Sequence, residues 1–448
     1  MRFSLLGLLI ATTTAVAQPP RAQRISLDDA LRTAAKVSYA LAAASAGVDA
    51  ARANVTAARS GYFPQVTVTA SYLNTIESEY DALFASSNTS NMLGTGFEAL
   101  PFGQAHTWRA GIDAQQLIWD GGKTGAGIAG AKANLRIIEL DERSRRAVVV
   151  LAVADAYASA VLADKLVGIG ESSLQLAEKT LEQAKLGFDQ GSTAEFDVVR
   201  AEVTRDTQRT AVLRARAARD LATLRIKRLL QLPLDRPIEL TTDLAGDVAP
   251  LAAGVAGVAA QKEAFSVARA RETVAARAAE VKSASSSWHP QVSAFTSYGL
   301  VDYPRTLRPD DEWRTNWTAG VNVTLPLFTG FRRKATIDAA KANRRASEAQ
   351  LADASAQAEL DLRTAKTNVD VAVATLQSNA RSVDLARRAY QIAEVRYQQG
   401  VSTYLELTDA RIALDRALGD QASAAKDLQV ARVRLALFPA LPPTQGTP

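Results

Sequence analysis

The stretch WTAGVNVTLPLFTG, Trp317 to Gly330, has a counterpart upstream in WRAGIDAQQLIWDG, Trp108 to Gly121. Each copy alternates apolar and polar residues, reaches a glycine, and gives way to a long segment with helical periodicity. Strict alternation over a short segment is typical of an amphipathic β-strand. The copies lie 209 positions apart, which predicts a tandem duplication whose halves each supply strands and very long helices.

The duplication extends well beyond these strands. The segment Leu176–Gly191 matches Leu385–Gly400 at the same offset of 209. Upstream the offset changes to 226, where YFPQV at Tyr62–Val66 matches WHPQV at Trp288–Val292. A period of this length indicates the duplication of a whole unit and not a solenoid of short repeats.

The chain of 448 residues begins with the pattern of a signal peptide. Arg2 is the positive residue, Phe3 to Ile10 form the apolar core, and Ala15 to Ala17 fit a cleavage site. We therefore predict residues 1–17 to be a signal peptide and the mature chain to be exported. No later segment reaches the roughly 20 uncharged residues of a spanning helix, so a membrane span would have to consist of strands.

The composition excludes several kinds of chemistry. There is no cysteine, which removes disulfides, thiolate metal sites and an N-terminal lipid-modified cysteine, and there are only two histidines. The net charge of +5 comes from cations interleaved with acids, a pattern of solvated helix faces more than of nucleic-acid binding. The GGKTGAG segment at Gly121–Gly127 fails as a phosphate loop because Leu117 stands where its first glycine is required. We predict no catalytic residue, no cofactor and no metal site, and therefore no enzyme.

Each half is predicted to contain an Ala-rich helix, a strand pair and two long helices. The first repeat covers 18–232, with a helix over Ser26–Arg59, a strand pair over about 64–120, and long helices over 122–190 and 193–231. The second covers 251–438, with a helix over about Leu251–Ser286, a strand pair over about 290–329, and long helices over 331–399 and 403–437. A linker over 233–250 joins the repeats, and 439–448 are predicted to be a disordered tail.

Glycines mark the junctions between these elements. We predict strand-to-helix turns at Gly121 and Gly330, and helix-to-helix turns at Gly191 and Gly400. Aromatic residues lie near the strand ends, where membrane-interface aromatics are expected: Tyr62, Trp108, Trp119, Trp288 and Trp317. Four strands cannot close a barrel alone, because the smallest transmembrane barrels need about 8. The strands must therefore lie in a soluble sheet or combine with those of other copies.

These motifs resemble a known family. The two Pro-Gln-Val segments, the Leu-Pro-Leu-Phe-Thr-Gly motif of Leu325–Gly330 and the Tyr-x-x-Gly turn of Tyr397–Gly400 are similar to those of TolC-like outer-membrane efflux proteins, over essentially the whole mature chain. The resemblance implies an α+β membrane protein. In it, three tandem-duplicated protomers, each giving four transmembrane β-strands and long α-helical hairpins, form one 12-stranded β-barrel and a periplasmic α-helical barrel.

The resemblance also implies where the protein acts and with what. It places the homotrimer in the lipid of the cell outer membrane, with a periplasmic extension that meets a periplasmic adaptor (membrane fusion) protein and an inner-membrane pump of the RND or ABC type. The predicted function is the outer-membrane channel of a tripartite efflux pump, a passive duct opened at its periplasmic tip by these partners. The cargo, whether drug, metal or protein, is chosen by the pump and is not readable in this chain.

The candidate site is the turn between the last two long helices, YQQGVSTYLELTDA at Tyr397–Ala410. Glu406 and Asp409 are three residues apart and share a helix face, so a trimer would carry two stacked acidic rings that favour cations. The resemblance places the family's aperture acids on these two residues and its closing contacts on Asp197 and Tyr397. The family often has an arginine where this chain has Ser402, so the resting state of the tip, open or closed, is not predicted.

Alternatives remain for both the site and the function. Thr403 with Glu406, and Ser192 with Glu195, fit helix-capping boxes that need no channel. The chain could also be the exit duct of a type I protein secretion system. A protein of another class, a periplasmic helical-hairpin adaptor or structural protein with a soluble β-domain, is opposed by the apolar series on one face of the last strand: Trp317, Ala319, Val321, Val323 and Leu325.

Overall fold

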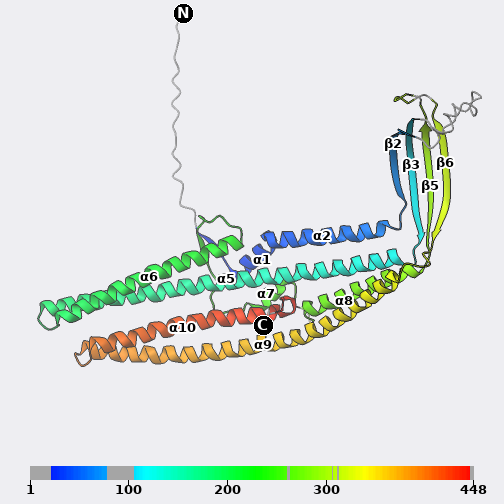
Figure 1. Cartoon of the computed structure of the whole chain (residues 1–448). Coiled ribbons are helices and arrows are strands. Elements are labelled where there is room, and N and C mark those ends of the chain that lie inside the picture. Colours follow the sequence, from blue (N-terminus) through cyan, green and yellow to red (C-terminus); the bar gives the residue numbers. More distant parts are fainter. Residues whose placement is uncertain (1–21, 78–104, 260–262, 305, 310–311, 444–448) are drawn as a thin grey trace, which may run out of the picture. The chain divides into compact units, whose positions relative to one another are not determined.

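The computed structural model describes residues 22–77, 105–259, 263–304, 306–309 and 312–443 (Figure 1). The predicted signal peptide lies outside the described residues, as do most of the segment between the first two strands and the last five residues of the tail. The chain divides into two compact units. The sheet unit comprises Ser45–Asp141 and Ser266–Ala356, and the helical unit comprises Met1–Ala44, Glu142–Phe265 and Gln357–Pro448.

The sheet unit contains one antiparallel four-stranded sheet with the order β2-β3-β5-β6 (Figure 1). Its strands are β2 (Gln65–Asn74), β3 (His106–Trp119), β5 (Gln291–Asp302) and β6 (Arg314–Thr324). The two halves of the duplication meet at the centre, where β3 pairs with β5 and Gly111 lies opposite Gly299. The first and last strands, β2 and β6, are the edges of this sheet, and neither has a partner on its outer side within it.

The two edge strands are amphipathic but contain no buried residue. Every residue of β2 is exposed, and in β6 the apolar residues Trp317, Val321 and Val323 are 73%, 63% and 62% exposed. A soluble sheet would place such a face against a core. The sheet unit of a single chain therefore presents an apolar face and two unpaired edges to its surroundings.

The Ala-rich helix predicted at the start of each half is broken into two. In the first half α1 (Leu27–Val37) and α2 (Tyr39–Ser60) are separated by Ser38, whose backbone is extended with φ −63° and ψ 120°. In the second half α7 (Ala249–Ala256) ends at Gly257, which has a left-handed φ of 71°, and α8 (Phe265–Ser285) begins afterwards. A short 3-10 turn, η2 (Ser286–Trp288), follows α8.

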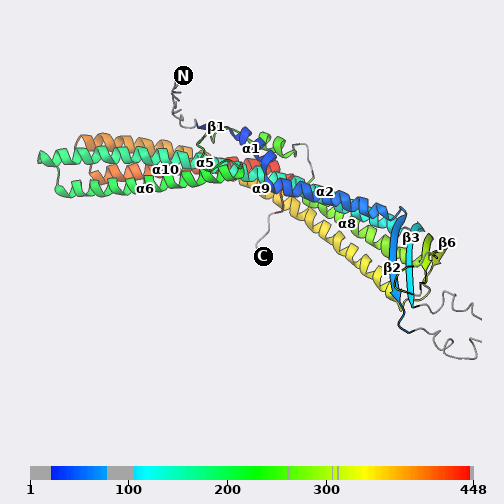
Figure 2. The same ribbon diagram turned by 90° about the horizontal axis from the view of Figure 1, so that it is seen from above.

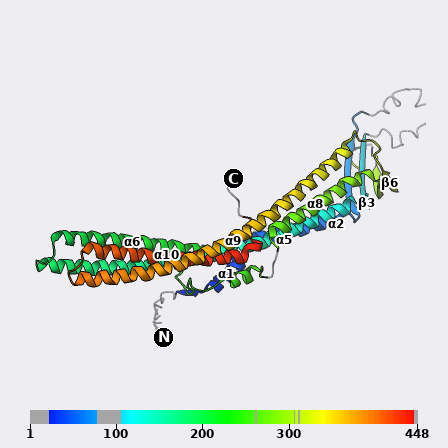
Figure 3. The ribbon, with the colours of Figure 1, turned by 90° about the horizontal axis from the view of Figure 1, so that it is seen from below.

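The long helices are α5 (Lys123–Asp189), α6 (Glu195–Leu229), α9 (Arg332–Gln398) and α10 (Tyr404–Leu437). Within the helical unit α5 runs antiparallel to α6, and α9 to α10 (Figures 1, 2 and 3). Each pair turns at a glycine in the left-handed region, Gly191 with φ 70° and Gly400 with φ 72°, where a side chain would be strained. Both glycines lie at the predicted turns.

The linker and the tail contain more structure than expected. In the linker, β4 (Ile238–Leu240) pairs in parallel with β1 (Gln23–Ile25). The buried Tyr157 of α5 fastens this pair, because its hydroxyl donates to the carbonyl of Ile25 at 3.0 Å and accepts from the N–H of Thr242 at 2.9 Å. In the tail, η3 (Phe438–Ala440) continues from α10, and burial of Ala440 against the helical unit keeps this first part ordered.

Within the described residues, α5 alone passes a test of length and composition for a membrane-crossing helix. Its best window of 18 residues has a mean hydropathy of 1.8, and 44% of that window is buried in the structure. Core helices of soluble units pass the same test, and α5 buries Val150, Val153 and Tyr157 in the helical unit. We therefore assign no membrane span to α5.

Candidate functional site

The turn between α9 and α10 fixes one of the two predicted acids. Thr403 is the N-cap of α10, and its side chain accepts a hydrogen bond from the N–H of Glu406 at 3.3 Å. The Glu406 side chain is held separately, because its carboxylate accepts a hydrogen bond of 2.6 Å from the hydroxyl of Ser402. Ser402, which stands where the family often has an arginine, thus holds the Glu406 side chain in the first turn of the helix.

The corresponding turn of the first half is built differently. The predicted capping box of Ser192 with Glu195 is absent, because α6 begins one residue after Ala194, whose side chain has no acceptor. The hydroxyl of Ser192 instead donates back to the carbonyl of Gly187 at 3.0 Å. A matching sequence spacing therefore produced a cap in only one of the two halves.

Glu406 and Asp409 lie together on the exposed face of α10. Tyr404 and Leu407, which alternate with them, are buried at 7% and 9% exposure. Both acids are exposed in the single chain. The helix geometry thus delivers two neighbouring carboxylates on one surface, as the three-residue spacing predicts.

Tyr397 of α9 packs where the two hairpins meet. Tyr397 packs against a small buried cluster that joins the helix pairs: Leu181, Ala184, Ala201 and Tyr404. Its ring lies 6.2 Å from that of Tyr404, edge to face. Burial raises the pKa of the Tyr397 hydroxyl, and the negative charge of Asp197 raises it further. Asp197 and Tyr397 are both half-buried, and the carboxylate of Asp197 is near enough to act on the charge of the Tyr397 hydroxyl.

A polar connection that the sequence did not reveal lies farther along the hairpins. The hydroxyl of Ser173 on α5, which is 2% exposed, donates to the carboxylate of Asp415 on α10. Asp415 also pairs with Arg411 at 3.5 Å, and Arg411 donates to the backbone carbonyl of Ser172 at 3.4 Å. Periodicity could not find this group, because it places residues on helix faces but does not set the register between two helices.

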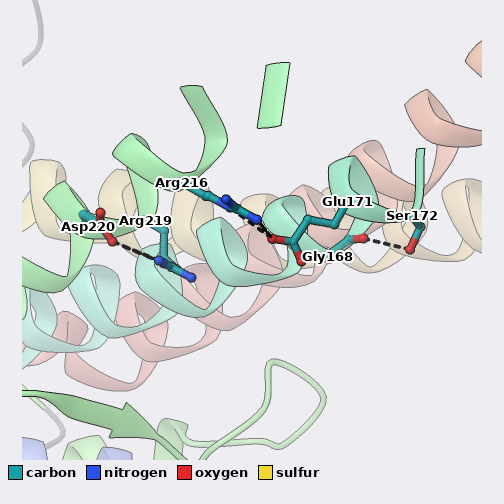
Figure 4. Close-up of polar contacts among 6 residues, drawn as sticks. All are labelled: Gly168, Glu171, Ser172, Arg216, Arg219 and Asp220. Carbon is teal, nitrogen blue, oxygen red and sulfur yellow. Dashed lines mark hydrogen bonds and ion pairs between the residues drawn. The ribbon is translucent and has the colours of Figure 1, made fainter. Parts of the chain in front are cut away.

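Neighbouring contacts of α5 show the difference between links within and between helices (Figure 4). Arg216 of α6 reaches Glu171 of α5 at 2.6 Å and joins the two helices of the first hairpin. By contrast, the hydroxyl of Ser172 donates to the carbonyl of Gly168 at 2.9 Å, within one helix. Ser172 and Ser173 are adjacent in sequence, and of their two hydroxyl groups only that of Ser173 bonds across to the second hairpin.

A cavity of about 830 Å³ lies beside the Ser173 group in the helical unit. Its lining is mainly apolar, with Leu176, Leu414 and Leu418, and includes Tyr390 and Arg411. Burial, and next the Glu394 carboxylate, raise the pKa of Tyr390 to about 12. Tyr390 therefore stays protonated through the neutral range.

Four of the five predicted interface aromatics lie at the two ends of the sheet. Trp108 lies against Tyr72 near one end, with ring centroids 4.8 Å apart, whereas Trp317 is paired with Tyr298, level with Ile112 and four residues further in along β3. At the other end Trp119 contacts His289 at 5.8 Å, and Trp288 lies under the Arg333 guanidinium at 4.3 Å. The fifth residue, Tyr62, is 52% exposed beside this second end.

The glycine pair of the GGKTGAG segment forms a turn. Gly121 and Gly122 have left-handed φ angles of 67° and 86° between β3 and α5.

Among the residues that the structure describes, no group of three or more His, Asp and Glu side chains is placed to hold a metal ion.

Comparison with solved structures identifies the fold class of this chain. The fold is shared with outer-membrane channels, among them VceC from Vibrio cholerae, at 21% identity and a TM-score of 0.73 over 92% of this chain and 96% of that one. The CmeC channel of Campylobacter jejuni gives a TM-score of 0.75 at 15% identity, over 98% of this chain and 94% of CmeC. These likenesses define the fold of an outer-membrane channel protein.

The sequence then gives the family. The model of the outer membrane efflux protein family matches residues 30–231 and 257–438, and the chain belongs to this family. The efflux protein BepC of Brucella suis is 24% identical over 398 residues, which cover 86% of this chain and 79% of BepC. Nodulation protein T of Rhizobium leguminosarum is 22% identical over 62% of this chain, and the match spans 58% of that relative's length. The predicted resemblance and the predicted outer-membrane location are confirmed.

Proposed function

We propose that this protein is the outer-membrane duct of a tripartite efflux system and that three copies close one 12-stranded barrel. The observation that supports this proposal best is the four-stranded sheet, whose edge strands β2 and β6 lack outer partners and whose apolar face is exposed. Unpaired edges are open to pairing with another chain. Four strands from each of three copies would remove every edge.

The spacing of the aromatic residues fits a membrane strand. Trp108 and Trp119 are eleven residues apart in β3. At about 3.4 Å per residue they are separated by roughly 37 Å along the strand. A tilt of about 45° reduces that to roughly 26 Å, close to the height of about 25 Å of the apolar band between aromatic girdles.

Exposed apolar residues on the long helices support an assembly as well. Phe196, Val203 and Leu213 of α6 are 60–70% exposed in the single chain, as is Ile392 of α9 at 62%. Large apolar side chains spread along helices are expected to be covered when neighbouring copies pack side by side. The helices of three copies would then enclose a periplasmic tunnel, and an adaptor and an inner-membrane pump would engage its far end.

Membrane fractionation followed by single-channel recording tests this function. The full chain is expected in the outer-membrane fraction as a trimer, and the purified trimer is expected to conduct ions in a planar bilayer. A soluble monomer without conductance would refute the proposal. Conductance by a different oligomer would refute the trimeric barrel.

The aperture role of Glu406 and Asp409 is tested on the same bilayer. Two stacked rings of carboxylates would bind polyvalent cations, so Glu406→Ala with Asp409→Ala should weaken block by such cations roughly ten-fold or more. The control removes two exposed carboxylates of α9 away from the turn, Asp370→Ala with Asp384→Ala. Unchanged block in the first variant, or equal loss in both, would remove the acidic rings from the proposal.

A further inference from the structure

The N-termini of α5 and α9 occupy equivalent positions of the duplication, but only that of α5 is preceded by an acid. Before α5, the Asp120 carboxylate accepts from the N–H of Gly122 at 3.0 Å and from the N–H and hydroxyl of Thr124 at 2.7 and 2.6 Å. Burial would raise the pKa of Asp120, but these hydrogen bonds outweigh it and lower the pKa. An internal anion thus satisfies the N-terminus of α5, where the helix dipole is positive.

At the N-terminus of α9 the anion is missing. Thr329 occupies the position that corresponds to Asp120, and the first turn contains no acid. It contains three consecutive cations instead: Arg332, Arg333 and Lys334. Cations are unfavourable at a helix N-terminus, because both the dipole and the unpaired N–H groups favour an anion. A departure from the usual charge preference at a helix terminus is typical of a functional site.

Arg333 adds an independent observation. It is only 8% exposed, its two terminal nitrogens donate to the carbonyls of Ser287 and Leu327 at 3.0 Å each, and its Nε is buried without a partner. Among the described residues, no carboxylate pairs with it within ion-pair distance. The face of the Trp288 ring lies 4.3 Å from the guanidinium, but neither this ring nor the two carbonyls supplies a full negative charge. A buried charge without a counter-ion is costly, so the site favours an anion from outside the chain.

Arg333 lines a cavity of about 750 Å³ within the sheet unit, with Lys123 and Arg332 beside it. Two acids also line the cavity, but both are already engaged. Asp120 caps α5, and Glu280 pairs with Arg277 at 2.8 Å. The three cations therefore give the cavity a net positive charge.

The surroundings of the cavity indicate which anion would bind. Leu327, Phe328 and Phe331, which precede α9, are 86%, 78% and 77% exposed. Phe331 has a left-handed φ of 63°, a conformation that strains a residue with a side chain, and the corresponding residue of the first half is Gly122. The second half thus has an exposed aromatic side chain at a position where glycine would be less strained. These residues follow β6 directly, at the end of the sheet that leads into the helices. In an outer-membrane protein this is the level of the lipid headgroups.

We propose that this cavity binds the phosphate of an anionic phospholipid of the periplasmic leaflet, with Arg332, Arg333 and the N-terminus of α9 as its ligands. The exposed Leu327, Phe328 and Phe331 lie where the acyl chains begin. The proposal rests on the outer-membrane placement of the sheet and does not depend on what the duct transports.

The test measures binding of phosphatidylglycerol to the purified full-length trimer in detergent micelles by native mass spectrometry. Arg332→Gln removes one exposed ligand and leaves Arg333, which supports the turn, in place. Thr329→Asp gives α9 the internal anion that Asp120 gives α5. Both variants are expected to bind phosphatidylglycerol roughly five-fold more weakly, because a charge-assisted contact or the open anion site is lost. The matched control is Arg345→Gln, an exposed arginine farther along α9, which should bind like the wild type.

Each outcome decides the proposal. Equal phosphatidylglycerol binding by the wild type, Arg332→Gln and Thr329→Asp would overturn it. Displacement of the lipid by an equal concentration of inorganic phosphate would overturn the lipid as the source and leave a free-anion site. A protein that sorts to the outer membrane and conducts, yet binds the lipid equally in all variants, would refute this inference alone. A protein that neither sorts nor conducts would refute the proposed function.

Discussion

Replacing Gly121 by alanine should destabilise the sheet unit far more than the same change at Gly330. Both glycines begin the turn from a strand into a long helix, with left-handed φ angles of 67° and 58°. They are equivalent positions of the duplication, so they share backbone geometry and differ in surroundings. A Cβ at Gly121 would stand 2.6 Å from the Cβ of His289 and 3.0 Å from the carbonyl of Ser286, whereas nothing lies within 4 Å of one at Gly330.

The magnitudes follow from these contacts. A left-handed alanine costs about 1–2 kcal/mol, which the reduced entropy of the unfolded chain offsets by about 0.4–1 kcal/mol. Gly330→Ala should therefore lower the free energy of unfolding by roughly 1 kcal/mol or less. At Gly121 the backbone of the 3-10 turn η2 must also move, and overpacking of this kind adds about 1–3 kcal/mol. We expect Gly121→Ala to lose roughly 2–4 kcal/mol.

Guanidinium denaturation of the detergent-solubilised protein measures the difference. Tryptophan fluorescence reports on the junction directly, because Trp119 lies 5.8 Å from the His289 ring that the new methyl group would push. Far-ultraviolet circular dichroism follows the helices alongside. Equal midpoints for the two variants would refute the assignment of Gly121 to close packing. A Gly330→Ala loss as large as that of Gly121→Ala would show that backbone conformation alone decides both positions.

Two further predictions concern the helical unit. Ser173→Ala should lower the free energy of unfolding by about 1–3 kcal/mol, because Asp415 loses a hydrogen bond that joins the two hairpins. The control is Ser172→Ala, because the Ser172 hydroxyl bonds only within α5. This control should leave the free energy of unfolding nearly unchanged in the same guanidinium titration. The raised pKa of Tyr390 sets a pH dependence: the protonated phenol is favoured in the folded state, so its contribution is complete below pH 10 and is lost as the pH rises through about 12. Tyr390→Phe should flatten the fall in stability across that window, and a fall as steep as in the wild type would assign the alkaline loss to other groups.

Much of the fold could be predicted because its determinants are local in sequence. Three signals each act over neighbouring residues: the alternation in Trp317–Leu325, the glycines at Gly191 and Gly400, and the absence of proline from Gly122 to Gln190 and from Phe331 to Gln399. The two long helices after the strands accordingly begin and end within a residue or two of the predicted positions. The duplication also supported the prediction, because each helix and strand could be predicted independently in both halves.

The features that could not be predicted depend on contacts between distant residues. The extended Ser38 that separates α1 from α2 has no proline or glycine to announce it. The β1–β4 pair joins residues more than 200 positions apart and depends on the buried Tyr157 hydroxyl. At the site, spacing placed Glu406 and Asp409 on one face, but it could not show that Ser402 holds Glu406 or that Ser173 reaches Asp415.

The differences between the two halves suggest how one duplicated hairpin serves two purposes. In the second half, Glu406 and Asp409 face outward from the first turns of α10, and Thr403 and Ser402 hold Glu406 there. At the corresponding positions the first half has Asp197 and Arg200. Both are half-buried, and Arg200 approaches Tyr404 of the other hairpin.

Asp197 acts on Tyr397, and the Arg200 guanidinium lies 6.0 Å from the centre of the Tyr404 ring. Arg200 thus contributes a cation–π contact between the hairpins, while Glu406 and Asp409 stay on the exposed surface that the proposed aperture role requires. Arg200→Gln should therefore lower the free energy of unfolding without changing cation block in the bilayer, and the double alanine variant of Glu406 and Asp409 should do the reverse.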